Sequence, residues 1–176
     1  MLEDMTLCYR QLFGRWATGV AVILGEDADQ VVGLTVNSLT SASLNPLLLL
    51  FCARNESRSA AAVLRSRRFS VNVLAAHQEN IARYFSGARD RNVKLGCVRG
   101  EGFVWLAGAN AVFRCEVEAA YPGGDHRIIL GRVVDMMGPE ECDRPLLYHN
   151  GRYTHLEQQT EGRALLNKKQ SGVERL

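Results

Sequence analysis

Short polar side chains crowd one stretch of the chain, residues 35–43. Hydroxyl or amide groups occupy six of its nine positions, at Thr35, Asn37, Ser38, Thr40, Ser41 and Ser43. The flanking segments, 20–24 and 47–53, are strongly apolar. Because polar groups that leave water need hydrogen-bond partners, the stretch suits a surface that binds a phosphate, a polyol or the edge of a heterocycle. The same residue types also form ordinary polar loops with Asx and Ser/Thr turns, so both interpretations stay open.

A second polar cluster, Asn55-Glu-Ser-Arg-Ser59, has the pattern of a helix start. If Ser57 is the N-cap, the first free N–H groups of the helix point outward together with the Ser57 and Ser59 hydroxyls. Arg58 adds positive charge. Unpaired N–H groups and the helix dipole both favour an anion. The cluster therefore predicts an anion site, and a plain N-cap beside a surface arginine is the alternative.

His126 and Phe85 are further candidates for ligand contact. His126 follows Gly124-Asp125 at the junction of a turn and a strand, where its imidazole could face a cleft or simply lie on the surface. Phe85 ends a predicted helix in the run Arg83-Tyr-Phe85, where core packing is the default role.

The cysteines give no metal or redox motif. They stand at Cys8, Cys52, Cys97, Cys115 and Cys142, and no pair has C-x-x-C spacing. Zinc ligation and a redox dithiol are therefore poorly supported. We expect no metal site, and scattered, unpaired thiols indicate a reducing compartment, the cytoplasm.

The composition is that of an ordinary globular domain. The 176 residues are 47% hydrophobic and 23% charged, and the net charge is +2. This charge balance gives no reason to expect a nucleic-acid partner. No apolar run reaches the roughly 18–20 residues of a membrane span, and the acidic N-terminus does not have the pattern of a signal peptide.

Periodicity predicts a mainly β fold whose strands are mostly joined by hairpins. Helices are expected over 2–16, 57–65 and 77–85, and strands over 20–24, 31–36, 47–53, 69–74, 111–120, 126–137, 145–149 and 152–156. The strand over 47–53 is expected to be buried on both faces, and residues 88–102 to form a mobile loop. This order favours an antiparallel barrel with short peripheral helices. We expect one domain over 1–157 and a polar tail over 158–176.

Six motifs together resemble a known family. They are Gly14–Val20, Gly33–Ser38, Ser41–Pro46, Asn55–Ser59, Phe69–Leu74 and Gly124–His126. In this order and at this spacing they are similar to the short-chain flavin reductases with an FMN-binding split barrel, the reductase partners of two-component flavin monooxygenases. The resemblance spans roughly residues 8–156. It implies an antiparallel split β-barrel with peripheral helices, usually a homodimer, that uses NADH or NADPH to reduce FMN or FAD.

The resemblance also implies a set of site residues. It places the flavin phosphate near Ser57 and Ser59, the isoalloxazine edge along 51–53, and His126 on the nicotinamide side, where it positions that ring. The flavin contacts implied are Thr35, Val36, Asn37, Ser38, Ser41, Ser43, Phe51, Cys52, Ala53, Ser57, Arg58, Ser59 and Phe85.

Two other functions remain open from the sequence. One is a flavin-dependent oxidase or oxygenase of the same fold that acts directly on an organic substrate. The other is a non-enzymatic module that binds flavin or haem. The residues do not choose between FMN and FAD, between NADH and NADPH, or among partner monooxygenases.

Overall fold

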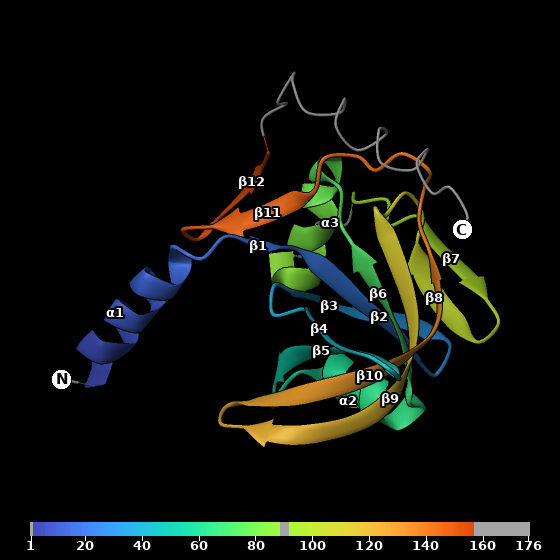
Figure 1. The fold of residues 1–176 in the computed structure, drawn as a ribbon, viewed down its shortest axis with the longest axis horizontal. Helices are drawn as coiled ribbons and strands as arrows, with labels where there is room; N and C mark the ends of the chain where they lie inside the picture. Colours follow the sequence, from blue (N-terminus) through green and yellow to red (C-terminus); the bar gives the residue numbers. More distant parts are fainter. Residues whose placement is uncertain (1, 89–91, 157–176) are drawn as a thin grey trace, which may run out of the picture.

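Seven antiparallel strands form the main sheet of the structure, a computed structural model that describes residues 2–88 and 92–156 (Figure 1). The strands lie in the order β3-β2-β6-β9-β10-β5-β4. Their bounds are β2 Ala21–Asp27, β3 Gln30–Val36, β4 Thr40–Leu44, β5 Leu47–Arg54, β6 Arg68–Val73, β9 Ala111–Gly123 and β10 His126–Met137. The mainly β class expected from the sequence is confirmed. No ladder joins β3 to β4 in the described part of the chain, so this sheet is curved but not hydrogen-bonded into a closed barrel.

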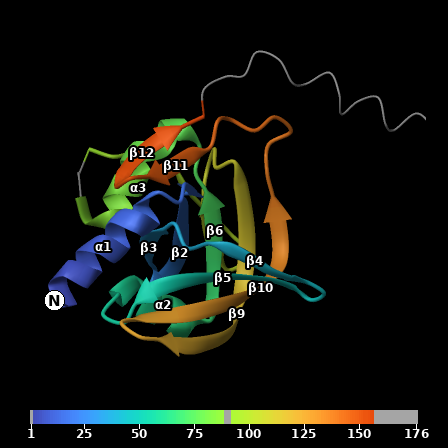
Figure 2. The ribbon, with the colours of Figure 1, turned by 60° about the vertical axis from the view of Figure 1, so that its left-hand side comes forward.

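Smaller elements surround the main sheet (Figures 1 and 2). A three-stranded sheet has the order β1-β11-β12, and β7 pairs with β8. These strands are β1 Thr18–Gly19, β7 Cys97–Gly100, β8 Phe103–Leu106, β11 Leu146–His149 and β12 Arg152–His155, and the helical segments are α1 Leu2–Gly14, α2 Arg58–Ser66, η1 Ala76–Gln78, α3 Glu79–Arg83 and η2 Tyr84–Ala88. None of the helices in the described residues is long and apolar enough to cross a membrane.

Local turn chemistry explains the hairpins that the sequence predicts. Asn150 and Gly151 join β11 to β12 with φ angles of 48° and 74°. Two successive positive φ angles are what a two-residue hairpin turn requires, and Asn-Gly adopts them readily. Ala28 and Asp29 turn β2 into β3 in the same way, with φ angles of 48° and 65°. Both predicted hairpins are confirmed.

The prediction of a loop over 88–102 is wrong for its C-terminal part. Cys97–Gly100 forms β7 and pairs with β8 through a turn at Glu101 and Gly102, whose φ angles are 53° and 76°. Residues 89–91 and the tail expected over 158–176 lie outside the described residues.

The strand prediction for 47–53 also needs correction. Leu49, Phe51 and Ala53 of β5 are buried, whereas Leu48 and Cys52 on the opposite face are only partly covered. The alternation means that one face of β5 packs in the core and the other borders open space.

A buried polar pair fastens the β7–β8 hairpin to the main sheet. Asn72 and Ser70 of β6 are fully buried. The Asn72 Nδ2 donates to the Val22 carbonyl (3.0 Å) and to the Ser70 hydroxyl (2.9 Å), and its Oδ1 accepts from the Leu106 N–H (2.7 Å). The Ser70 hydroxyl in turn donates to the Val104 carbonyl. One side chain thus joins β2, β6 and β8.

Replacing Asn72 by Ala should destabilise the domain by about 2–4 kcal/mol, because it leaves buried backbone groups of β2 and β8 without partners. Urea unfolding followed by tryptophan fluorescence measures the change. Asn110→Ala is the matched control, since the hydrogen bond from that side-chain amide to the Asp143 carbonyl (2.9 Å) is exposed. Equal stability losses in the two variants would contradict the role given to Asn72.

Candidate active site

The start of α2 has the geometry that the sequence predicts. Ser57 is the N-cap, with φ −66° and ψ 110°, and its hydroxyl accepts a hydrogen bond from the Ala60 N–H (3.2 Å). The other N–H groups of the first turn have no partner within the helix. Because Ser57 lines a cavity, this end of the helix is available to an anion.

The cavity at this helix end has a volume of about 590 Å³. It lies between β3 and β5, with the start of β10 and the segment η2 at its margins. Its lining residues are Leu34, Thr35, Val36, Asn37, Ser38, Cys52, Ala53, Arg54, Glu56, Ser57, Phe85, Ser86 and His126. We call it the first cavity.

Hydroxyl groups cross-link the elements that enclose the first cavity. The Ser38 Oγ accepts from the Cys52 N–H (2.9 Å) and donates to the Cys52 carbonyl (3.4 Å). Thr35 donates to the Ala82 carbonyl of α3 (2.7 Å), and Ser59 donates to the Gly33 carbonyl of β3 (2.8 Å). These hydroxyl protons are therefore used by the protein itself.

Strand β3 presents mainly backbone N–H and C=O groups to a ligand. It is an edge strand whose ladder partner in the described sheet is β2. Every second N–H and C=O of such a strand points away from its neighbour and lacks a ladder bond. Asn37, which follows β3 and is exposed, adds an amide side chain to the same lining.

His126 lines the first cavity at the start of β10. It opens β10 and lies opposite Arg54 of β5. The Asn55 N–H donates to the Asp125 carbonyl, and the Asn55 side chain donates to the Gly124 carbonyl, each at 3.0 Å. These bonds tie the turn before His126 to the segment that leads into α2.

Asp125 orients the His126 ring. Its Oδ1 lies 2.7 Å from the His126 Nδ1. This hydrogen bond lowers the pKa of the Asp125 carboxyl, with the imidazole charge as a further cause. A carboxylate at this place accepts the Nδ1 proton, which leaves Nε2 as the free ring atom.

Phe85 reaches the first cavity because β3 carries a glycine opposite it. A Cβ at Gly33 would lie 2.6 Å from the Phe85 ring and 2.6 Å from the Leu24 side chain. The ring therefore packs directly on the backbone of β3. Tyr84 meets it edge-to-face, with ring centroids 5.0 Å apart.

The structure brings together most, but not all, of the site residues expected from the sequence. Those that line the first cavity are Thr35, Val36, Asn37, Ser38, Cys52, Ala53, Ser57, Phe85 and His126. Ser41 and Ser43 line a separate apolar groove along β4 and β5. Phe51 is fully buried and packs edge-to-face on Phe69. Arg58 and Ser59 lie on α2, outside the lining.

Sequence reasoning missed four lining residues, Leu34, Arg54, Glu56 and Ser86. The period-2 alternation of β5 carried a usable signal for Arg54, since it shares a strand face with Cys52. No comparable signal existed for Ser86, because its place depends on the π-helical turn η2.

Comparison with known proteins agrees with this geometry. The family model of the flavin reductase like domain matches residues 13–157. The chain belongs to this family. It is 36% identical over 154 residues to the NADH-dependent FMN reductase AsuE2 of Streptomyces nodosus subsp. asukaensis, a match that covers 84% of this chain and 83% of that protein.

Two further relatives are similar over most of their length. The reductase subunit HsaB of a flavin-dependent monooxygenase from Rhodococcus jostii is 39% identical over 152 residues, covering 85% of this chain and 77% of HsaB. The solved structure of the NADH:FAD oxidoreductase SgcE6 of Streptomyces globisporus, in complex with NAD and FAD fragments, has a TM-score of 0.82 and 32% identity, covering 90% of this chain and 96% of that one. The recognition made from the six motifs is confirmed.

Gly33→Ala should move the Phe85 ring and disturb the first cavity. We expect a stability loss of about 1–3 kcal/mol from overpacking and a roughly tenfold lower flavin affinity. Urea unfolding and fluorescence titration with FMN measure the two effects. Gly19→Ala is the control, because a Cβ there meets nothing within 4 Å. Wild-type flavin affinity in a folded Gly33→Ala protein would show that the contact between Gly33 and Phe85 does not shape the site.

Proposed function

We propose that this protein is an NAD(P)H-dependent flavin reductase that supplies reduced FMN or FAD to a separate monooxygenase. The observation that carries the proposal is the first cavity itself. Its lining brings together an anion-binding helix end at Ser57, an oriented imidazole at His126, and Cys52 and Ala53 of β5. A flavin has the matching chemistry, a phosphate at one end and a flat polar ring system at the other.

The phosphate end would lie at the start of α2. Free N–H groups of the first helical turn and the Ser57 N-cap favour an anion there. Arg54 lines the same cavity and adds a guanidinium, and exposed Arg58 adds charge from the first turn of α2. Glu56 is the carboxylate among the described lining residues. Because it would repel a phosphate, we expect the phosphate to lie nearer to Ser57 than to Glu56.

The ring end would lie against β3 and β5. The outward N–H and C=O groups of β3 suit the hydrogen-bonding edge of an isoalloxazine, and Cys52, on the partly covered face of β5, lines the same cavity. A bound flavin would supply the N5 acceptor for a hydride from the nicotinamide C4. The protein's part is to hold the two rings in contact, with Phe85 limiting water and the His126 Nε2 positioning the nicotinamide.

Oxidation of NADH and NADPH, measured with FMN, with FAD and without flavin, tests this function. A reductase consumes reduced nicotinamide steadily while free flavin is in excess. Failure to oxidise either nicotinamide with either flavin would contradict the proposal. Turnover that needs an added organic substrate would instead indicate an oxidase or oxygenase.

His126→Ala should separate binding from chemistry. We expect flavin affinity to stay near that of the wild type, while reduction of bound flavin or the affinity for NAD(P)H weakens about ten- to a hundredfold. Stopped-flow absorbance under anaerobic conditions measures both. His77→Ala is a matched control, since His77 also pairs with a carboxylate, Asp143 at 3.4 Å, but lies outside the first cavity. Wild-type kinetics in a well-folded His126→Ala protein would remove His126 from the site.

We further propose that the protein is a homodimer in the cytoplasm. Helix α1 projects from the body of the domain (Figures 1 and 2). Its large apolar side chains are more than half exposed, at Met5, Leu7, Tyr9, Leu12 and Phe13. A lone helix with an uncovered apolar face gains little stability, and a second copy is the commonest cover for such a surface. Five free thiols support a reducing compartment.

Light scattering should give a mass of twice the 19.5 kDa of one chain. The double substitution Leu12→Glu, Phe13→Glu should shift the protein toward the monomer, because it places two carboxylates in the apolar face of α1. Gln11→Glu, an exposed change on the same helix, should leave the mass unchanged. A monomeric wild type at micromolar concentration would disprove the dimer.

A further inference from the structure

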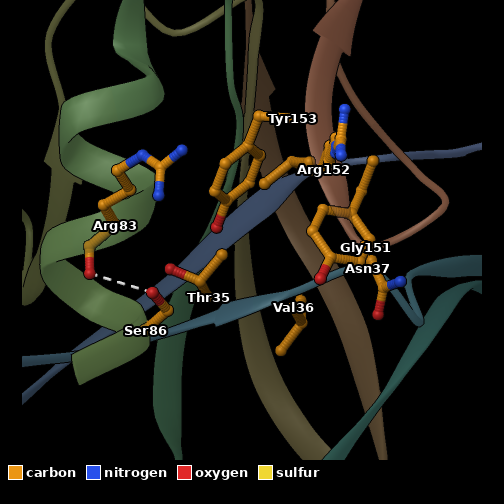
Figure 3. A pocket seen from close by; sticks show the side chains of 10 residues that line it. Thr35, Val36, Asn37, Arg83, Ser86, Gly151, Arg152 and Tyr153 are labelled. Atoms are coloured by element: carbon orange, nitrogen blue, oxygen red, sulfur yellow. Dashed lines mark hydrogen bonds between the residues drawn. The ribbon is translucent and has the colours of Figure 1, made fainter. Parts of the chain in front are cut away.

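Polar side chains on the η2 side of the first cavity are fixed by hydrogen bonds to the helical segment. The Ser86 hydroxyl donates to the Arg83 carbonyl (2.9 Å), a bond that Figure 3 shows as a dashed line. The Thr35 hydroxyl donates to the Ala82 carbonyl (2.7 Å). His126 differs from these residues because it follows an exposed turn. Its ring therefore needs another support.

The turn before His126 has little packing of its own. Gly124 and Asp125 form this turn between β9 and β10, and both are exposed. Gly124 has a φ angle of 73°, and a Cβ there would meet nothing within 4 Å. The pairing of β10 with β5 places the backbone of His126 opposite Arg54. The direction of the His126 ring, however, depends on where the turn places the Asp125 carboxylate, whose Oδ1 lies 2.7 Å from Nδ1.

Asn55 holds this turn from the neighbouring segment. Its side-chain Nδ2 donates to the Gly124 carbonyl, and its backbone N–H donates to the Asp125 carbonyl, each at 3.0 Å. One residue thus binds both carbonyls of the turn. The hydrogen bond with His126 is the main cause that lowers the pKa of the Asp125 carboxyl, and the charge of Arg54 is a smaller one. The segment 54–55 therefore supports both the position and the charge of the group that orients His126.

The segment that carries Asn55 is itself anchored. Strand β5 ends at Arg54, and the Ser57 N–H donates to the Arg54 carbonyl (3.0 Å). Ser57 then caps α2. Asn55 does not belong to the lining of the first cavity, although both of its sequence neighbours do. It therefore acts on a ligand through the turn that it holds.

We propose that Asn55 is a positioning residue for the reaction, which acts through the Gly124-Asp125 turn to set the direction of the His126 ring. The inference rests on the proposed function for the role of His126 toward the nicotinamide. While the turn is held, Nδ1 faces Asp125 and Nε2 is the free ring atom. Without the Asn55 amide the turn moves more freely, the contact between Asp125 and His126 is made for less of the time, and either ring nitrogen can carry the proton.

Asn55→Leu tests this role, because leucine has a similar size and its side chain carries no hydrogen-bond donor. Asn55→Gln keeps the amide. Asn110→Leu is the matched control, since the Asn110 amide also forms an exposed bond to a backbone carbonyl, that of Asp143, but lies outside the lining of the first cavity. The experiment measures kcat/KM for NADH and NADPH with FMN as acceptor, and the affinity for FMN by fluorescence titration. Melting curves check that each variant is folded.

Asn55→Leu should lower kcat/KM for the reduced nicotinamide about three- to tenfold, the scale of one lost hydrogen bond, while FMN affinity changes less than about twofold. Asn55→Gln should recover part of the loss, and Asn110→Leu should change neither quantity. In a His126→Ala background, Asn55→Leu should have almost no further effect, because effects that pass through one group are not additive.

Three kinetic results would overturn the proposal. They are wild-type kcat/KM in a folded Asn55→Leu protein, an equal loss with and without His126, and a fall in FMN affinity as large as the fall in kcat/KM. The last result would show that Asn55 serves the flavin rather than the histidine.

Nuclear magnetic resonance of the imidazole nitrogens tests the placement without flavin reduction. The His126 signals are assigned by their loss in His126→Ala. In alkaline buffer, where imidazole rings are neutral, we expect the proton on Nδ1 in the wild type and a mixture of both tautomers in Asn55→Leu. This result supports the role of Asn55 even if the protein reduces no flavin and the proposed function fails. An unchanged His126 tautomer in Asn55→Leu overturns the proposal, even if flavin reduction is robust.

Discussion

The hydrogen bonds between Ser38 and Cys52 set the geometry on which the site depends. In the order of the main sheet, β3 stands at one end and β5 next to the other. The Ser38 hydroxyl forms hydrogen bonds with both the N–H and the carbonyl of Cys52. A side chain therefore replaces the backbone-to-backbone hydrogen bonds that join neighbouring strands elsewhere in the sheet. The Ser38 hydrogen bonds hold the segment after β3 against β5 without a strand ladder between them. The first cavity lies beside this junction, with both Ser38 and Cys52 in its lining.

The same logic explains why so many short hydroxyl residues surround the cavity. The Thr35 and Ser59 hydroxyls also donate hydrogen bonds to carbonyls of neighbouring elements. A wall built in this way keeps its partly buried polar groups paired when no ligand is present, as folded proteins require. Among the described residues around the first cavity, the edge of β3 and the start of α2 then offer backbone donors to a ligand. These places define where an anion or a polar ring edge can bind.

Much of the architecture was predictable from local sequence. The Asn150-Gly151 turn and the Ser57 N-cap act within a few residues, so short-range pattern reading finds them. His126 was found through the family resemblance, and its place opposite Arg54 follows from the pairing of β10 with β5. The β7–β8 hairpin was missed because neither Cys97–Gly100 nor Phe103–Leu106 alternates apolar with polar residues, the pattern that marks a half-buried strand.

The errors at the site arise from contacts between distant segments. Ser41 and Ser43 belong to the same polar stretch as Ser38, but β4 shifts register between them and runs along an apolar groove. Phe51 adjoins Cys52 in sequence and therefore points to the opposite face of β5. Ser86 lies far from Thr35 in the sequence, and only the fold brings them to one cavity. No local sequence pattern predicts such contacts between distant segments.

A crystal structure of the protein with FMN tests the central claim most directly. The account predicts the phosphate at the N-terminal turn of α2, within hydrogen-bond distance of Ser57, and the isoalloxazine between β3 and β5, in contact with Cys52 or Ala53 and facing His126. Density for the flavin in the apolar groove of Ser41 and Ser43, or with its phosphate away from α2, would contradict the account.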